Sequence, residues 1–248
     1  MRDLEGLWKT ARAELVIPAE GGGSDVFLWE HSVRVATCAK YLSRLPEAQE
    51  ENPDPLALLA AALFHEAGWI SKWRAGSIKR HDILLGSSNE SIMTESVRLM
   101  QKSLRDLVPP TSLQRASETI MSRFGSPPAL IESDILQDAD NLEEFGLGFL
   151  WMTIRRGICG GRGVQAVLDA WKRRIEYQFW RTRIQDAFRF EVSRQLAKAR
   201  LQHLESLMGE MAVQHDVEDV RKMVESRRGC PLAPVDWLRD GEKRASQG

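Results

Sequence analysis

Residues 56–68 have the sequence LALLAAALFHEAG, and this stretch decides how the rest of the chain is interpreted. Its first nine residues are apolar on every side of a helix, which leaves no face for water and predicts a helix that is buried all round. Pro55 stands where the first turn of that helix would begin. His65 and Glu66 follow directly. Polar groups at the end of a buried helix are costly unless they are paired or hold a metal ion.

Helical patterns continue on both sides of this stretch, with apolar residues at helical spacing and residues suited to helix caps. We predict further helices over residues 3–14, 25–45, 89–106, 112–123, 128–144, 178–213 and 215–227. A polar loop is expected at 68–87 and a glycine-rich break at 157–163. No segment shows a convincing alternation of period two. The sequence therefore predicts an all-α helical bundle with a long C-terminal helix. Its main domain would span residues 25–212, between an N-terminal helix and loop (1–24) and a C-terminal helix and tail (213–248).

The composition is typical of a soluble globular protein. The 248 residues can form one large domain, and 43% of them are apolar. The net charge of -1 produces no overall field that would draw the chain to nucleic acid or an anionic membrane. No apolar run approaches the ~20 residues of a membrane span, and the first residues lack the apolar core of a signal peptide. We therefore expect a cytoplasmic protein, a monomer or homodimer, with no nucleic-acid polymer and no membrane as partner.

Two other segments carry side chains suited to metal binding. His31 lies in a predicted helix, with Arg34 on the same face at i+3. Far downstream, Asp138 and Asp140 lie in a later helix. Imidazole and carboxylate groups together suit Mn, Fe, Ni, Co or Zn ions. Residues two apart are separated by roughly 200° around a helix, so the two aspartates cannot both be ligands at one centre.

The order of these segments resembles the HD superfamily of metal-dependent phosphohydrolases. Trp29–Ala36 resembles the His-x-x-Arg-Val segment of the family, Ala61–Gly68 its buried helix and His-Asp pair, and Gln137–Leu142 its Asp-Ala-Asp-Arg-Leu segment. The resemblance covers residues 25–212. With the glycine-rich break at 160–163, it is greatest for a bacterial branch that includes nucleoside triphosphate pyrophosphohydrolases.

This resemblance implies a set of site residues and a reaction. The implied metal ligands are His31, His65, Glu66 and Asp140, with Glu66 and Asp138 as catalytic residues. Asp140 is preferred to Asp138 as the ligand because the family's ligand aspartate stands in an Ala-Asp-(Arg/Lys)-Leu setting. One divalent metal ion (Mn, Co, Ni, Fe, Zn or Mg) would polarise a phosphoryl oxygen and lower the pKa of a water molecule. The implied activity is hydrolysis of a phosphate ester or anhydride in a small molecule, in particular a nucleotide.

Basic residues near these ligands are candidates for binding the phosphate. The candidate substrate-binding residues are Arg34, Lys72, Arg74, Lys79 and Arg80. Four of them lie in the predicted loop that follows directly from the His-Glu pair, and arginine suits bidentate contact with phosphate. A solvated loop is the alternative interpretation of the same charges.

Two departures from the family pattern keep other functions open. Glu66 replaces the usual aspartate, and Asn141 replaces the usual basic residue. One extra methylene matters because metal geometry is sensitive at ~0.2 Å. A catalytically inactive HD-like module that binds a ligand or a partner is therefore an alternative. A dinuclear iron oxygenase is a weaker one, because residues 82–202 contain no histidine for a second metal.

Overall fold

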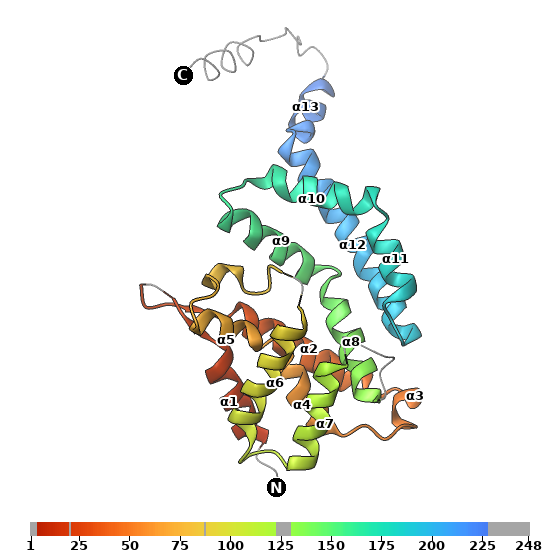
Figure 1. Cartoon of the computed structure of the whole chain (residues 1–248). Coiled ribbons are helices and arrows are strands. Elements are labelled where there is room, and N and C mark those ends of the chain that lie inside the picture. The colour runs from red at the N-terminus through yellow and green to blue at the C-terminus, as the bar shows by residue number, and fades with distance from the viewer. Residues whose placement is uncertain (1–3, 20, 87, 123–129, 228–248) are drawn as a thin grey trace. The chain divides into compact units, whose positions relative to one another are not determined.

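The computed structural model describes residues 4–19, 21–86, 88–122 and 130–227, and helices dominate them (Figure 1). The strands in these ranges are β1 (Ile17–Pro18) and β2 (Ser24–Asp25), which pair antiparallel. The all-α class predicted from the sequence is confirmed. The chain divides into two compact units, Met1–Ser206 and Leu207–Gly248. Every residue of the site described below belongs to the first unit.

The helices of the first unit are taken in two groups, in the order of the chain. The first group consists of α1 (Leu4–Leu15), α2 (Phe27–Leu42), α3 (Pro46–Gln49), α4 (Pro55–Phe64), α5 (Gly68–Arg74), the short 3-10 helix η1 (Arg80–Asp82), α6 (Glu90–Leu104), α7 (Pro110–Met121) and α8 (Ile131–Glu143). The second consists of α9 (Leu147–Cys159), α10 (Val164–Glu176) and α11 (Phe179–Asp186). Helix α12 (Glu191–His215) crosses into the second unit, which also contains α13 (Glu218–Glu225).

Helix α4 is the buried element that the sequence predicts. It packs against α1, α2, α6, α7 and α8, and its residues from Leu56 to Phe64 are buried except for the half-buried Leu59. Asp54 caps it, because its Oδ1 accepts hydrogen bonds from the backbone N–H groups of Leu56 (2.9 Å) and Ala57 (3.1 Å). The helix therefore has a fixed start and a packed body, and its end delivers His65 to a defined place.

The segment after α4 differs from the predicted loop, because α5 and η1 lie within residues 68–87. Gly68 begins α5 at a point of close approach to α6. A Cβ atom there would lie 1.9 Å from the carbonyl oxygen of Ile92, so only glycine fits. Ser96 fastens the same turn, since its hydroxyl accepts from the Gly68 N–H (2.8 Å) and donates to the His65 carbonyl (3.0 Å). The glycine and the charges made this segment resemble a loop, whereas tertiary contacts make it a helix.

The single helix predicted over 178–213 is also wrong, because α11 and α12 are separated at residues 187–190. Asp138 binds the chain at this break. Its carboxylate accepts hydrogen bonds from the backbone N–H groups of Arg189 (2.7 Å) and Phe190 (3.0 Å). Phe188 and Phe190 are buried there. A break fixed by a residue 51 positions before Arg189 leaves no local signal in the sequence.

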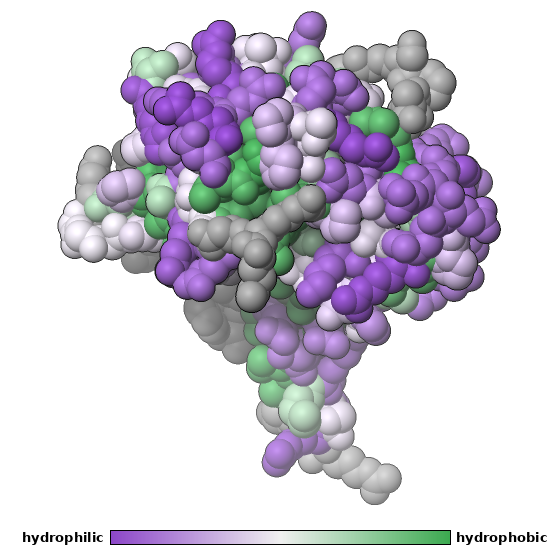
Figure 2. All heavy atoms as spheres, turned by 90° about the horizontal axis from the view of Figure 1, so that it is seen from below, coloured by the Kyte–Doolittle hydropathy of each residue, from purple (hydrophilic) through white to green (hydrophobic). Residues whose placement is uncertain are grey.

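Hydrophilic residues cover much of the face shown in Figure 2, and hydrophobic residues gather between them. Among the described helices, none combines the length and the apolar character that crossing a bilayer requires.

Candidate metal centre

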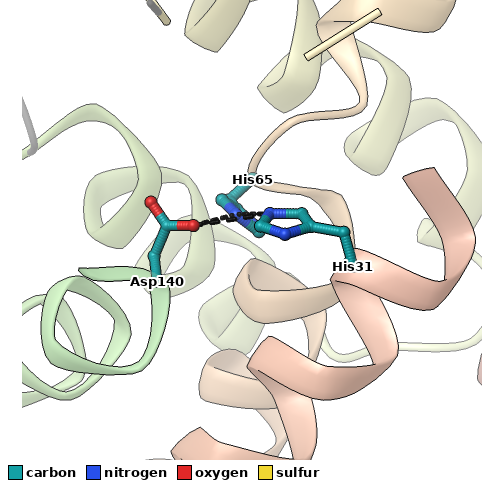
Figure 3. Close-up of side chains that lie close together, drawn as sticks. All are labelled: His31, His65 and Asp140. Carbon is teal, nitrogen blue, oxygen red and sulfur yellow. Dashed lines mark hydrogen bonds and ion pairs between the residues drawn. The ribbon is translucent and has the colours of Figure 1, made fainter. Parts of the chain in front are cut away.

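Three side chains from distant parts of the sequence meet at one point: His31 from α2, His65 from the end of α4 and Asp140 from α8 (Figure 3). Their potential ligand atoms all lie within 4.8 Å of one another. The Nε2 atoms of the two histidines are 3.2 Å apart. Asp140 Oδ1 lies 3.3 Å from His65 Nε2 and 3.4 Å from His31 Nε2. In the part of the chain that the structure describes, no other group of three or more His, Cys, Asp or Glu residues is placed in this way.

The three atoms fit a divalent metal ion in both chemistry and spacing. Two imidazole nitrogens and one carboxylate oxygen are a donor set that such ions accept. With metal–ligand bonds of about 2.1 Å, tetrahedral ligand atoms lie about 3.4 Å apart. The separations of 3.2, 3.3 and 3.4 Å are close to that value. The group could therefore hold a metal ion with little rearrangement.

His65 is oriented by the helix that carries it. The side chain is fully buried, and its Nδ1 lies 2.9 Å from the carbonyl oxygen of Ala62. Because a carbonyl only accepts hydrogen bonds, Nδ1 carries the proton. The lone pair of the neutral ring is then on Nε2, the atom that faces His31 and Asp140. The backbone therefore selects the tautomer that a metal ion requires.

His31 lies between two carboxylates. Its Nε2 faces Asp140, and its Nδ1 lies 3.7 Å from Oε2 of Glu143. Burial acts to lower the pKa of His31, but hydrogen bonds and charge from Asp140 and Glu143 outweigh it and raise the pKa to about 9. Burial acts in turn to raise the pKa of Glu143, which His31 and Arg34 bring below its ordinary value. The two carboxylates thus favour positive charge at His31, and a bound metal cation would supply that charge in place of the proton.

Glu66 follows His65 in sequence but lies outside the group of three. Its Oε2 accepts hydrogen bonds from Trp69 Nε1 (2.8 Å) and from the Ser88 hydroxyl. The residue is 5% exposed and lines the same cavity as His31 and Asp140. Its predicted roles as fourth ligand and catalytic carboxylate stay predictions.

The two aspartates of α8 point in different directions, as their spacing on the helix predicts. Asp140 belongs to the group of three, whereas Asp138 is 1% exposed and binds the backbone at residues 189 and 190. Burial raises the pKa of Asp138 above its ordinary value, although these hydrogen bonds act to lower it. In the structure Asp138 fastens the start of α12 to α8, and its catalytic role stays a prediction.

A cavity of about 620 Å³ opens beside the three side chains, and we call it the metal-site cavity. Its lining includes His31, Asp140, Glu66 and Arg34. Arg34 donates from Nε to Glu143 Oε2 at 2.7 Å, which holds its guanidinium at the wall. A volume of this size suits a small molecule.

The other basic residues proposed from the sequence are placed elsewhere. Lys72, Arg74, Lys79 and Arg80 are not among the residues that line the metal-site cavity. Arg74 pairs instead with Glu14 at 2.7 Å, and Arg80 lies 3.8 Å from Asp25. Binding of a substrate by these four residues stays a prediction.

Three arginines that the sequence analysis missed line the cavity: Arg156 of α9, Arg174 of α10 and Arg183 of α11. Their charges resemble the solvated face of an amphipathic helix, which conceals them in the sequence. Asn141 offers the one signal. It replaces a basic residue of the family pattern, and its Oδ1 accepts a hydrogen bond from Arg183 Nη2 at 3.0 Å. A cation from another helix thus lies beside this position.

Comparison with known proteins gives a fold and no family. No protein-family model matches the chain, and no curated protein matches it. Among solved structures, Bacillus subtilis YpgQ is 18% identical with a TM-score of 0.50, over 93% of this chain and 100% of that one. The selenomethionine form of the same protein is 18% identical with a TM-score of 0.49, over 92% of this chain and 97% of that one. The structure of its complex with ADP is 17% identical with a TM-score of 0.48, over 92% of this chain and 99% of that one. The first of these likenesses fits the helical HD-type fold expected from the sequence motifs.

Proposed function

We propose that this chain is an HD-type metal-dependent phosphohydrolase that cleaves a phosphate ester or anhydride in a nucleotide. One observation carries the proposal. His31, His65 and Asp140 converge at the wall of a cavity that also presents Arg34 and other arginines. Ligands for a divalent cation beside guanidinium groups are the combination that phosphoryl transfer requires, because the phosphate oxygens carry negative charge.

The proposed roles of the residues follow from their positions around the cavity. His31, His65 and Asp140 would hold one divalent ion, with Glu66 as the proposed fourth ligand. Such an ion, when bound, polarises a phosphoryl oxygen and lowers the pKa of a water molecule. Arg34 has further N–H donors beyond the one committed to Glu143, and these would bind phosphate oxygens.

Glu66 is the proposed acceptor of the proton that the attacking water loses. Its carboxylate lines the metal-site cavity and is adjacent in sequence to a ligand. Trp69 and Ser88 hold that carboxylate by hydrogen bonds. A general base must be held within reach of the water, and the hydrogen bonds from Trp69 and Ser88 hold the Glu66 carboxylate in place.

A second candidate function rests on the same contacts. The hydrogen bonds from Trp69 and Ser88 occupy Glu66 Oε2, and Glu66 lies outside the group of three. If they hold Glu66 away from both proposed roles, the chain would be an HD-like module that binds a metal ion and a phosphate compound without hydrolysing it.

The test measures metal content first and turnover second. Wild-type protein, His65→Ala and the control His203→Ala, which removes an exposed histidine of α12, are purified without chelator and analysed by mass spectrometry for metals. We expect about one ion per chain in the wild type and the control and none in His65→Ala. Protein loaded with Mn or Co is then given a panel of nucleotides, and release of phosphate or pyrophosphate is measured.

Each outcome separates the candidates. Hydrolysis by the wild type and the control, lost in His65→Ala, supports the hydrolase. Metal binding and nucleotide binding without turnover support the binding module. Two iron ions per chain support the oxygenase, and no metal after reconstitution contradicts the proposal.

A further inference from the structure

A second cavity, of about 390 Å³, adjoins the metal-site cavity, and we call it the arginine cavity. Helices α9 and α10, the loop between them and the start of α11 form it. The two cavities share four lining residues, which are Thr153, Arg156, Arg174 and Phe179. The arginines of its wall are Arg156, Arg162, Arg173 and Arg174. No carboxylate is among the described residues that line it.

The backbone and the small side chains of this region leave the space open. Gly161, at φ +66°, turns the chain between α9 and α10, and the Arg162 N–H donates to the Gly157 carbonyl at 2.8 Å. Ala166 and Ala170 lie one turn apart on α10 and form the wall together with Gly157. Long cationic side chains thus surround a floor of small residues, which is the shape of a site for a small anion.

The positive charges in the arginine cavity are crowded and only partly balanced, because Glu144 attracts Arg174 without forming an ion pair with it. Within the described residues, Arg156, Arg162, Arg173 and Arg174 make no ion pair with a carboxylate. Arg155 provides the contrast, because it lies next to Arg156 in sequence and pairs with Asp25 at 2.8 Å. Uncompensated like charges at close range are unfavourable, and an anion would relieve the repulsion.

Arg174 connects the two cavities and is held in place. Its guanidinium lies over the rings of Phe149 and Phe179, with its central carbon 4.8 and 5.4 Å from the ring centroids. Burial and the positive charges of Arg156 and Arg173 lower the pKa of Arg174 below its ordinary value, against the effect of Glu144. A fixed, partly desolvated guanidinium between two cavities can contact one ligand that extends into both.

We propose that the arginine cavity is a second anion-binding site, which takes the phosphate group remote from the one at the metal centre. The inference rests on the proposed function and names a feature of the substrate: at least two phosphate groups in one molecule. Arg156 and Arg174 would contact the connecting part of the substrate, because they line both cavities. Arg162 and Arg173, which line only the arginine cavity, would bind the remote phosphate.

The experiment uses metal-free full-length protein, so its result does not depend on turnover or on metal binding. Inorganic tripolyphosphate and orthophosphate are titrated into wild type and Arg162→Gln/Arg173→Gln by calorimetry. Arg181→Gln is the matched control, because Arg181 is an exposed arginine of α11 that lines neither cavity. We expect tripolyphosphate to bind about tenfold more weakly for each cavity arginine removed, and equally well to the control. Both arginines are exposed, and circular dichroism verifies that the variants fold.

A further variant distinguishes a phosphate of the substrate from a free phosphate ion. Arg183 lines only the metal-site cavity, so Arg183→Gln weakens tripolyphosphate binding as well if one ligand spans both cavities. Binding that responds to Arg162→Gln/Arg173→Gln and not to Arg183→Gln would overturn the shared-ligand proposal in favour of a separate phosphate site. Equal binding by the wild type and the double variant would overturn the arginine cavity as an anion site. A protein that passes this titration but fails to bind metal would contradict the proposed function alone.

Discussion

The helices that carry the metal-binding group and those that carry the arginines are held by different means. Helix α4 is buried along nearly its whole length and packs against five other helices, α1, α2, α6, α7 and α8. Buried positions are few in α9 and α10: Phe149 and Gly157 in the first and Val167 in the second. The core therefore sets the positions of His31, His65 and Asp140, whereas the arginines lie on elements with less packing. Changes in the first region should affect stability and metal binding, and changes at the arginines that line a cavity in the second should affect ligand affinity.

The largest effect is expected from Gly68→Ala, which disturbs the buried region. Its Cβ would collide with the backbone of Ile92, and backbone cannot yield as a flexible side chain does. We expect a loss of at least about 3 kcal/mol in the free energy of unfolding, together with loss of bound metal. The measurement is denaturant unfolding.

Gly209→Ala is the control for that variant, because a Cβ there meets nothing within 4 Å. Alanine in place of an exposed helical glycine should leave the stability unchanged or raise it by up to about 1 kcal/mol. Equal stability of both variants would mean that the contact between Gly68 and Ile92 is less tight than described.

Asp140→Asn and Asp138→Asn separate metal binding from structure within one helix. Replacing the carboxylate at position 140 should weaken Mn affinity at least about 100-fold in a competition titration. The same change at position 138 should leave Mn affinity intact and cost about 1 kcal/mol of stability, because its hydrogen bonds to the start of α12 weaken. Normal stability with lost turnover in Asp138→Asn would instead support the catalytic role predicted from the sequence.

Asp54→Ala tests how the start of α4 supports its end. Loss of the helix cap should cost about 1–2 kcal/mol at pH 7, measured by urea unfolding. Burial acts to raise the pKa of Asp54, but hydrogen bonds from Ser112, Ala57 and Leu56 bring it below its ordinary value of 3.8. The stabilisation is therefore fully present above the unfolded pKa and is lost as the pH falls through the folded one. The difference between wild type and variant should shrink below about pH 4. Asp106→Ala, at a strongly exposed position, should show no such difference.

Arg155→Gln and Arg156→Gln give the smallest effects and the sharpest contrast. Arg155 binds Asp25 and lies over the Phe27 ring, so its loss should cost about 1 kcal/mol of stability without changing phosphate affinity. Arg156 lines both cavities, and its hydrogen bond to the Leu85 carbonyl is exposed, so its loss should weaken tripolyphosphate binding about tenfold and cost less stability than the loss of Arg155. The reverse pattern would contradict the different roles assigned to these two neighbouring arginines of α9.

The sequence predicted the buried helices of the metal centre better than the helices that carry the arginines. Helix α4 was recognisable because its residues are apolar on every side, and the motif order selected His31, His65 and Asp140. Helix α5 and the break before α12 were missed because they depend on Ile92 and Asp138, which are distant in sequence. The arginine wall was missed because charge on an exposed helix has the same pattern whether it faces solvent or a cavity. The spacing of apolar residues along a helix indicates which face is buried, but it does not indicate whether the polar face meets solvent or lines a cavity.

Glu143 has a consequence for the order in which ligands bind. Its Oε2 lies 2.7 Å from Arg34 Nε and 3.7 Å from His31 Nδ1, so one carboxylate serves a side chain at the metal centre and a proposed phosphate ligand. A cation bound at His31 changes the charge that Glu143 experiences and so the strength of its bond to Arg34. Metal and phosphate are then thermodynamically linked, and each changes the affinity of the other by the same factor. A single oxygen atom shared by His31 and Arg34 is enough to couple the two binding equilibria.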